Sequence, residues 1–417
     1  MNLYRLELKR VCKTRMTAIL LAIALVLAVV MAYLPVTFIG WTELNASGNE
    51  VRYTGLKAIR KRQEQQVSGT ITPDVMQEAL EAYQREYRQY DASSINDIPV
   101  EVFYKELARY QPLVNNAKEA FADPKTGMAP GVMGLAAEDM QNFYSQLPKR
   151  LESVIWLEQS GKPGYEQAQA IAQKKFDAVQ KPFTYSFGVS SDAMDYQTLL
   201  SLLLTLLCAV IAAPVFASDA QTGAQDIQLC TKNGGLRLAA AKLAAAFSIT
   251  GAAYLLCGVV WILVTNALFG WESTQTSVQW LFSVTSLLPY TVGQMEWVML
   301  VANFLIFFAE VAFVLMASVW AKNNLTALSV ALISVVAPLI VYMVVPGSFG
   351  EWLSTLIPAG GIGLSNALLY KMISFDFLYA GGHAFFQADV LLASAPIKIV
   401  LLVGLAAWGY LRKTKVA

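Results

Sequence analysis

The chain has 417 residues, of which 56% are hydrophobic and only 15% are charged. This composition excludes an ordinary soluble domain and indicates a membrane protein. Because 31 Lys and Arg residues balance 30 Asp and Glu residues, no overall basic field argues for a nucleic-acid partner. A single histidine and four scattered cysteines argue against a disulfide framework, a His-rich metal site or a Ser-His-Asp triad.

The first predicted element is a membrane span over residues 16–40. It follows the basic start MNLYRLELKRVCKTR and exceeds the roughly 20 uncharged residues that a helix needs to cross a bilayer. Its apolar region is too long for a cleaved signal peptide, so we expect an uncleaved helix. Residues 1–40 therefore form the N-terminus and the first span.

An insertion over residues 41–195 follows. Thr72-Pro73-Asp74 combines an N-cap residue, a first-turn proline and a carboxylate suited to a helix N-terminus. Apolar residues then recur at spacings of three and four, and the pattern returns three more times before residue 180, whereas strand-like alternation is scarce. We expect a small all-helical domain, which is either a substrate- or partner-binding cap or a solvated structural insertion.

The last part of the chain, residues 196–417, contains five further candidate spans. They cover residues 196–217, 243–269, 297–320, 325–345 and 392–411. Together with the first span they predict an all-α polytopic membrane protein with six transmembrane helices and both termini on one side.

The positions of Lys and Arg predict which side this is. Basic residues flank the spans on the side of the termini, whereas the loops 270–296 and 346–391 on the other side hold only Lys371. Because cytoplasmic flanks carry the positive charge, we expect a multi-pass protein of the bacterial cell membrane with cytoplasmic termini. Residues 41–195 then form an extracellular domain.

A short polar elbow over residues 218–242 joins the second and third spans. Gly223 stands four residues after Asp219, and a mixed polar and apolar stretch through Ile227 predicts a short amphipathic helix. Arg237 and Lys242 then lead into the third span.

This elbow resembles that of permease subunits in the type-2 ABC exporter family, and the resemblance extends to the layout of six spans with an enlarged loop after the first. It implies that the elbow is a coupling helix that docks on a separate ATP-binding subunit. The residues to which it assigns coupling are Asp219, Gly223, Asp226, Ile227, Arg237 and Lys242.

The sequence has no G-x-x-x-x-G-K-[ST] motif, so the chain cannot hold nucleotide phosphates by that device. We therefore expect a transport subunit rather than an enzyme, with no cofactor of its own and with ATP and Mg²⁺ on the ABC ATPase partner. A second permease, either another copy of this chain or a paralogue, would complete the translocation path as a dimer in the membrane lipid.

Two polar residues stand inside the predicted fourth span. Glu310 and Asn303 are seven residues apart and so share a helix face. They either line a translocation path or subunit interface, or serve as hydrogen-bonded packing residues. The apolar loop over 346–391 predicts two short interfacial or re-entrant helices, because neither of its halves is long enough to span.

The resulting prediction is the permease subunit of an ATP-driven exporter for an amphiphilic substrate such as a peptide, an antibiotic or a lipid. One alternative is a proton-coupled secondary transporter that uses Glu310. Another is a non-transporting membrane sensor or scaffold whose extracellular domain binds a ligand.

Overall fold

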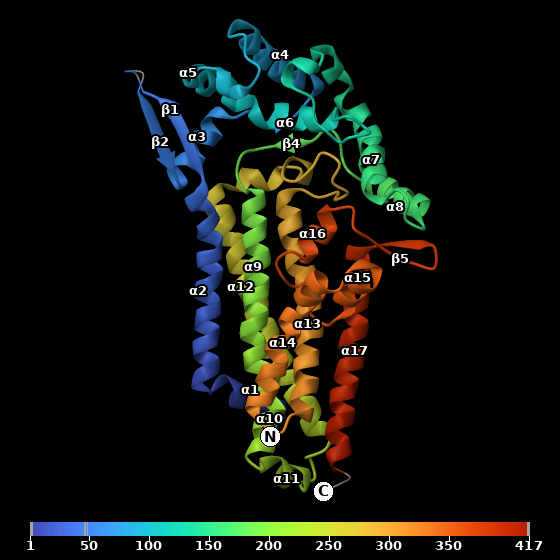
Figure 1. Ribbon diagram of the computed structural model, residues 1–417. Coiled ribbons are helices and arrows are strands. Elements are labelled where there is room, and N and C mark those ends of the chain that lie inside the picture. The colour runs from blue at the N-terminus through green and yellow to red at the C-terminus, as the bar shows by residue number, and fades with distance from the viewer. Residues whose placement is uncertain (1–2, 46, 48, 415–417) are drawn as a thin grey trace.

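The computed structural model describes residues 3–45, 47 and 49–414. Within these ranges the chain is an all-α polytopic membrane protein, with six helices long and apolar enough to cross a membrane. The six helices run side by side, and a head domain over residues 40–190 covers one end of the bundle (Figure 1). We name the opposite end, where both termini lie, the elbow end.

The six predicted spans are confirmed, and most of the helices extend beyond the apolar stretches that revealed them. The spanning segments are α2 (Arg15–Phe38), α9 (Ser191–Ala212) continued by α10 (Pro214–Gln221), α12 (Leu236–Phe269), α13 (Val292–Trp320), α14 (Asn324–Val344) and α17 (Gln387–Thr414). Hydroxyl caps set several starts. Thr14, Ser190 and Thr291 accept backbone N–H groups at the starts of α2, α9 and α13. Polar first turns are therefore helical although they add nothing to the hydropathy signal.

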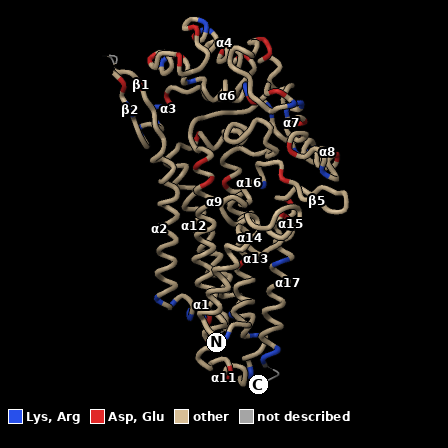
Figure 2. The backbone as a smooth tube through the Cα atoms, viewed as in Figure 1, with Lys and Arg blue, Asp and Glu red and all other residues tan. Residues whose placement is uncertain are grey.

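Helix α13 lies at the centre of the bundle and packs against α9, α12, α14 and α17. Its Phe307 ring stacks on Tyr254 of α12 with the ring centroids 4.4 Å apart. A short helix, α1 (Leu3–Cys12), packs against α12 at the elbow end. Figure 2 shows that charged residues gather at the two ends of the bundle and are sparse between them.

The head domain is mainly helical, as predicted. Its helices are α3 (Leu56–Gln65), α4 (Pro73–Gln89), α5 (Val100–Val102), α6 (Gln111–Ala120), α7 (Phe143–Gln159) and α8 (Tyr165–Asp177). The predicted start of α4 is confirmed, since the Thr72 hydroxyl accepts the Val75 N–H at 3.4 Å and Pro73 occupies the first turn. The head is fixed to the bundle by polar contacts, among them Gln63 Nε2 to the Phe269 carbonyl at 2.6 Å.

Three two-stranded antiparallel sheets depart from the all-helical expectation for the head and for the 346–391 loop. They pair β1 (Gly40–Leu44) with β2 (Glu50–Thr54), β3 (Gly69–Thr70) with β4 (Thr184–Tyr185), and β5 (Phe377–Ala380) with β6 (His383–Phe386). The longest strands have five residues, and β1 lacks alternating burial. Their period-2 signal is therefore too short and too weak to stand out in the sequence.

The loop between α14 and α17 contains the two expected short helices, α15 (Gly347–Leu356) and α16 (Leu368–Ile373). Gly361 lies between them with φ 91°, and a Cβ there would stand 2.9 Å from Ile306 Cδ1 of α13. At about 1.5 Å per residue, Ile306 is roughly 20 Å along α13 from Val292. The loop therefore enters between the spans as a re-entrant segment and does not stay at the membrane surface.

Candidate functional site

The elbow is built from two short helices separated by a glycine turn. Helix α10 ends at Gln221, and Gly223, with φ 72°, begins α11 (Ala224–Leu229). This left-handed conformation is one that glycine adopts without the strain a Cβ would introduce. Helix α11 therefore turns away from α10 and forms the tip of the molecule at the elbow end (Figure 1).

A buried cluster of charges holds the elbow to its neighbours. Asp219 of α10 accepts hydrogen bonds from Arg10 Nη1 of α1 at 2.9 and 3.1 Å, and from Lys242 Nζ of α12. Lys242 Nζ also donates to Gln228 Oε1 of α11 at 3.1 Å, and Arg10 Nη2 donates to the Val215 carbonyl at 2.9 Å. Four helices are therefore joined through one carboxylate and its two cationic partners.

The burial of this cluster determines its energetics. Asp219 is only 7% exposed and Lys242 only 1% exposed. Removing one member of a buried, hydrogen-bonded ion pair leaves the other charge uncompensated, which destabilises a protein by about 3–5 kcal/mol. Asp219 and Lys242 thus act as a structural joint and do not present a contact surface to another protein.

Helix α10 is also joined to the central helix α13. The Ser318 hydroxyl donates to the Ala213 carbonyl at 2.6 Å and accepts the N–H groups of Phe216 and Ala217 at 3.1 and 3.0 Å. These bonds satisfy the backbone where α9 gives way to α10. A displacement of α10 therefore acts on α13 directly.

The remaining predicted coupling residues are at the surface. Ile227 on α11 is 73% exposed, and Asp226 beside it and Arg237 at the start of α12 are exposed as well. Among the described residues, the Arg237 side chain has one hydrogen-bond partner: its Nη1 donates to Asn233 Oδ1 at 3.4 Å. An exposed isoleucine next to an exposed carboxylate is suited to docking another protein.

The structure thus divides the six predicted residues into a joint, a turn and an exposed surface. Sequence reasoning missed Arg10, although it counted this residue among the basic N-terminal flank. It also missed Ser318 as the contact to α10. In both cases the partner is more than 100 residues away, so no local pattern could identify it.

Glu310 and Asn303 are both buried in α13, as predicted, but they contact different helices. Glu310 is 0% exposed and accepts a hydrogen bond from Ser334 of α14, while its Oε2 has no hydrogen-bond partner among the described residues. Asn303 faces a void of ≈ 10 Å³ beside Ser201 of α9 and Tyr254 of α12. The two residues therefore do not form a single polar site.

Lys398 of α17 holds the re-entrant loop. Its Nζ donates to the carbonyls of Thr355 and Ile357 at 3.3 and 3.2 Å. These carbonyls belong to the C-terminal end of α15, where a cation is favoured by the helix dipole. Lys398 therefore joins α17 to the re-entrant loop.

A large, mostly apolar cavity of ≈ 810 Å³ lies where the head meets the bundle. Its walls come from α8, α13, α17, β6 and residues 287–290, and include Leu288, Phe386 and Leu392. Lys174 and Lys175 of α8 also line it, and Lys175 Nζ is 3.0 Å from Asp389 Oδ2. The size and lining suit a small amphiphile with an apolar body and a polar end.

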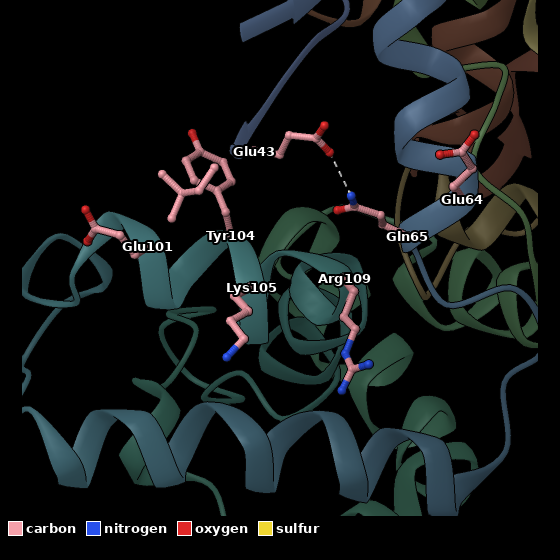
Figure 3. Close-up of a pocket in the computed structure, with 8 residues that line it drawn as sticks. Glu43, Glu64, Gln65, Glu101, Tyr104, Lys105 and Arg109 are labelled. Carbon is pink, nitrogen blue, oxygen red and sulfur yellow. Dashed lines mark hydrogen bonds between the residues drawn. The ribbon is translucent and has the colours of Figure 1, made fainter. Parts of the chain in front are cut away.

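A second cavity, of ≈ 510 Å³, lies within the head domain and is polar (Figure 3). Gln65 Nε2 donates to Glu43 Oε2 at 3.0 Å. Figure 3 shows this hydrogen bond, with Lys105 and Arg109 on a separate helical segment. Lys61 Nζ lies 3.4 Å from Glu43 Oε1, and this contact raises the pKa of the Lys61 ammonium group. The mixed charges favour water or a polar ligand over an apolar one.

Within residues 3–45, 47 and 49–414, no three His, Cys, Asp or Glu side chains are grouped so that they could hold a metal ion. A scan against models of known protein families finds no match, and a search of curated proteins finds no relative.

Proposed function

We propose that this chain is the membrane-spanning permease subunit of an ATP-driven ABC exporter. A separate ABC ATPase subunit, which binds ATP and Mg²⁺, would dock on α11 and move it during hydrolysis. The observation that carries this proposal is the connection of an exposed docking surface to the centre of the bundle. Asp219 and Ser318 join α10, which lies next to α11, to α1, α12 and α13.

The distribution of basic residues supports a cytoplasmic elbow end. The described Lys and Arg residues at this end are Arg5, Lys9, Arg10, Lys13, Arg15, Lys232, Arg237, Lys242, Lys322, Arg412 and Lys413, and Figure 2 shows the basic residues gathered there. Under the positive-inside rule this end faces the cytoplasm of a bacterial cell, and residues 41–195 are extracellular. An ATPase supplied with cytoplasmic ATP then meets α11 on the correct side.

The cavity of ≈ 810 Å³ supports an amphiphilic substrate. It combines an apolar wall with the two lysines of α8, so a peptide, an antibiotic or a lipid with an anionic end would be complementary to it. The exported molecule would pass from the spans to this cavity before release.

A second permease, either another copy or a paralogue, would complete the path. Helices α14 and α17 leave most of their apolar surface uncovered within one chain. This surface is available to membrane lipid and to the second permease.

The proposal is tested by replacing Ile227 with Glu in the assembled transporter. We expect the ATPase to dissociate and ATP-dependent transport to be lost, while thermal stability and membrane insertion stay unchanged, because Ile227 is exposed and buries little within this chain. Ile227→Val is the matched control, since it keeps an apolar side chain at the same exposed position and should retain both the ATPase and transport. Normal ATPase binding and transport in the Ile227→Glu variant would contradict the proposed docking surface.

A further inference from the structure

The charged side chains that line the cavity of ≈ 810 Å³ are all on its head side. They are Lys174 and Lys175 of α8 and Asp389 in the first turn of α17. The apolar wall extends further along the spans, to Val298 in the second turn of α13 and to Ala393 in the second turn of α17. A bound molecule therefore meets charge beside the head domain and an apolar wall along the bundle.

The charges of this lining leave one lysine without a counterion. Two lysines and one aspartate give the lining a net charge of +1. Lys175 Nζ is 3.0 Å from Asp389 Oδ2, so the charge of Lys175 is compensated. Lys174 is exposed and takes part in none of the ion pairs formed between described residues. An anionic group is therefore the favoured partner of Lys174.

An uncovered apolar stripe of α17 continues the wall of the cavity toward the elbow end. Val390 and Ala393 line the cavity, and Ile397 and Val400 follow them on the same helix face at spacings of four and three residues. Ile397 is 61% exposed and Val400 is 71% exposed. Helix α17 lies at the edge of the bundle (Figure 1). The stripe is therefore open to the acyl chains of the bilayer.

The length of this stripe matches one leaflet of a membrane. Residues 390–400 extend over about 15 Å at 1.5 Å per residue. Half of the hydrocarbon core of a bilayer is also about 15 Å thick. Because the stripe begins at the head end, an acyl chain along it would occupy the leaflet next to the head domain, which we name the head-side leaflet.

Other occupants fit fewer of these features. Water would find few polar partners along the apolar wall. An inorganic anion could pair with Lys174 but would leave the apolar wall uncovered. A zwitterionic phospholipid would cover the wall, but its headgroup would bring a second cation close to Lys174. An anionic phospholipid satisfies the charge, the apolar wall and the length of the stripe together.

We propose that the cavity and the α17 stripe bind an anionic phospholipid of the head-side leaflet. Its headgroup pairs with Lys174, and one of its acyl chains contacts the apolar wall and follows α17. This inference rests on the proposed function, because it names the amphiphile of the proposed substrate cavity as a membrane lipid. The binding itself needs neither ATP nor a partner subunit.

The test is native mass spectrometry of the purified full-length protein in detergent, with phosphatidylglycerol or phosphatidylcholine of identical acyl chains. We expect tighter binding of phosphatidylglycerol, which carries a net negative charge. Lys174→Gln should weaken this binding about fivefold, which corresponds to the roughly 1 kcal/mol that one lysine contributes beside an anionic lipid. Lys149→Gln is the matched control, because Lys149 is an exposed lysine of α7 outside the cavity lining, and it should leave the binding unchanged.

A second pair of variants tests the apolar part of the site. Ala393→Trp places a large side chain in the cavity wall at an exposed position, so it should weaken the binding of both phospholipids. Leu256→Trp is its control, because Leu256 is an exposed residue of α12 outside the cavity lining, and it should leave both affinities unchanged.

Equal affinity of the unchanged protein for the two phospholipids would overturn the proposal. Undiminished phosphatidylglycerol binding in the Lys174 or the Ala393 variant would also overturn it. A photo-reactive group in place of Ile397 that crosslinks two copies of the chain in native membranes would assign the stripe to a second permease and have the same consequence. Because binding is measured without ATP or an ATPase, it can fail while ATPase docking at Ile227 holds, and it can succeed while that docking fails.

Discussion

A buried carboxylate has cationic hydrogen-bond partners at the elbow end and neutral ones in the interior of the bundle. At the elbow end, Asp219 receives hydrogen bonds from two cationic side chains on two different helices. In the bundle, Glu310 and Glu296 each receive one side-chain hydrogen bond from a neutral group and keep one oxygen without a partner among the described residues. The carboxylate at the elbow is thus paired with cations, whereas each bundle acid is held by neutral groups alone.

The largest expected effect comes from neutralising the elbow carboxylate. Asp219→Asn leaves the Lys242 ammonium buried without its counterion, and we expect a loss of stability of about 3–5 kcal/mol. Thermal unfolding of the purified protein and its yield in membranes measure this loss. Asp226→Asn, a matched change at an exposed position, should leave both quantities unchanged.

A double variant sharpens this prediction. Changing Asp219 to Leu and Lys242 to Met together removes the unpaired charge and should recover part of the stability that Asp219→Asn loses. Equal unfolding midpoints for Asp219→Asn and the unchanged protein would show that the cluster is not a structural joint.

A smaller effect is expected at the glycine turn of the elbow. Gly223 has φ 72° and no atom within 4 Å of the position of a Cβ, so Gly223→Ala introduces backbone strain and no clash. Strain of this kind costs about 1–2 kcal/mol. We expect lowered thermal stability and reduced ATP-dependent transport.

Gly404→Ala is the control for the glycine turn, because Gly404 lies inside helix α17 with open space around it. A helical glycine is less favourable than alanine, so this variant should be as stable as the unchanged protein or more stable. Equal destabilisation of both variants would remove the special role of Gly223.

The smallest effect is expected for Glu310→Gln. Glutamine keeps the shape of the side chain and an oxygen to accept the Ser334 hydrogen bond, and Glu310 forms no ion pair with any described residue. We expect a change in stability below about 1 kcal/mol, well under the effect of Asp219→Asn. Thermal unfolding of both variants tests the order, and a loss at Glu310 as large as that at Asp219 would break the comparison.

The sequence predicted those features of the fold that depend on local patterns. Uninterrupted apolar stretches located the six spans, and the cap chemistry of Thr72 and Pro73 located the start of α4. The β1–β2 hairpin was missed because its strands are short and only partly alternating. Element starts were placed too late where polar first turns continue a helix, as at Ser191 and Val292.

Only part of the candidate site could be predicted, because the rest depends on contacts between segments that are far apart in the sequence. Asp219, Gly223 and Lys242 lie close together in the sequence, so the elbow could be recognised as one segment. Their pairing with Arg10 depends on the packing of α1 against α12, which no local pattern encodes. Glu296 was likewise overlooked, because hydropathy placed it at the edge of a span and not in the protein interior.

The central claim is that α11 docks a nucleotide-binding subunit, and the native cysteines allow a direct test. Cys230 directly follows α11 and is exposed, as is Cys12, whereas Cys208 and Cys257 are buried. A Cys12→Ser variant carrying a photo-crosslinker on Cys230 is irradiated in native membranes, and its adducts are identified. The predicted adduct is an ATPase with a P-loop motif, whereas absence of any ATPase adduct, or labelling of Cys230 from outside intact cells, would contradict the claim.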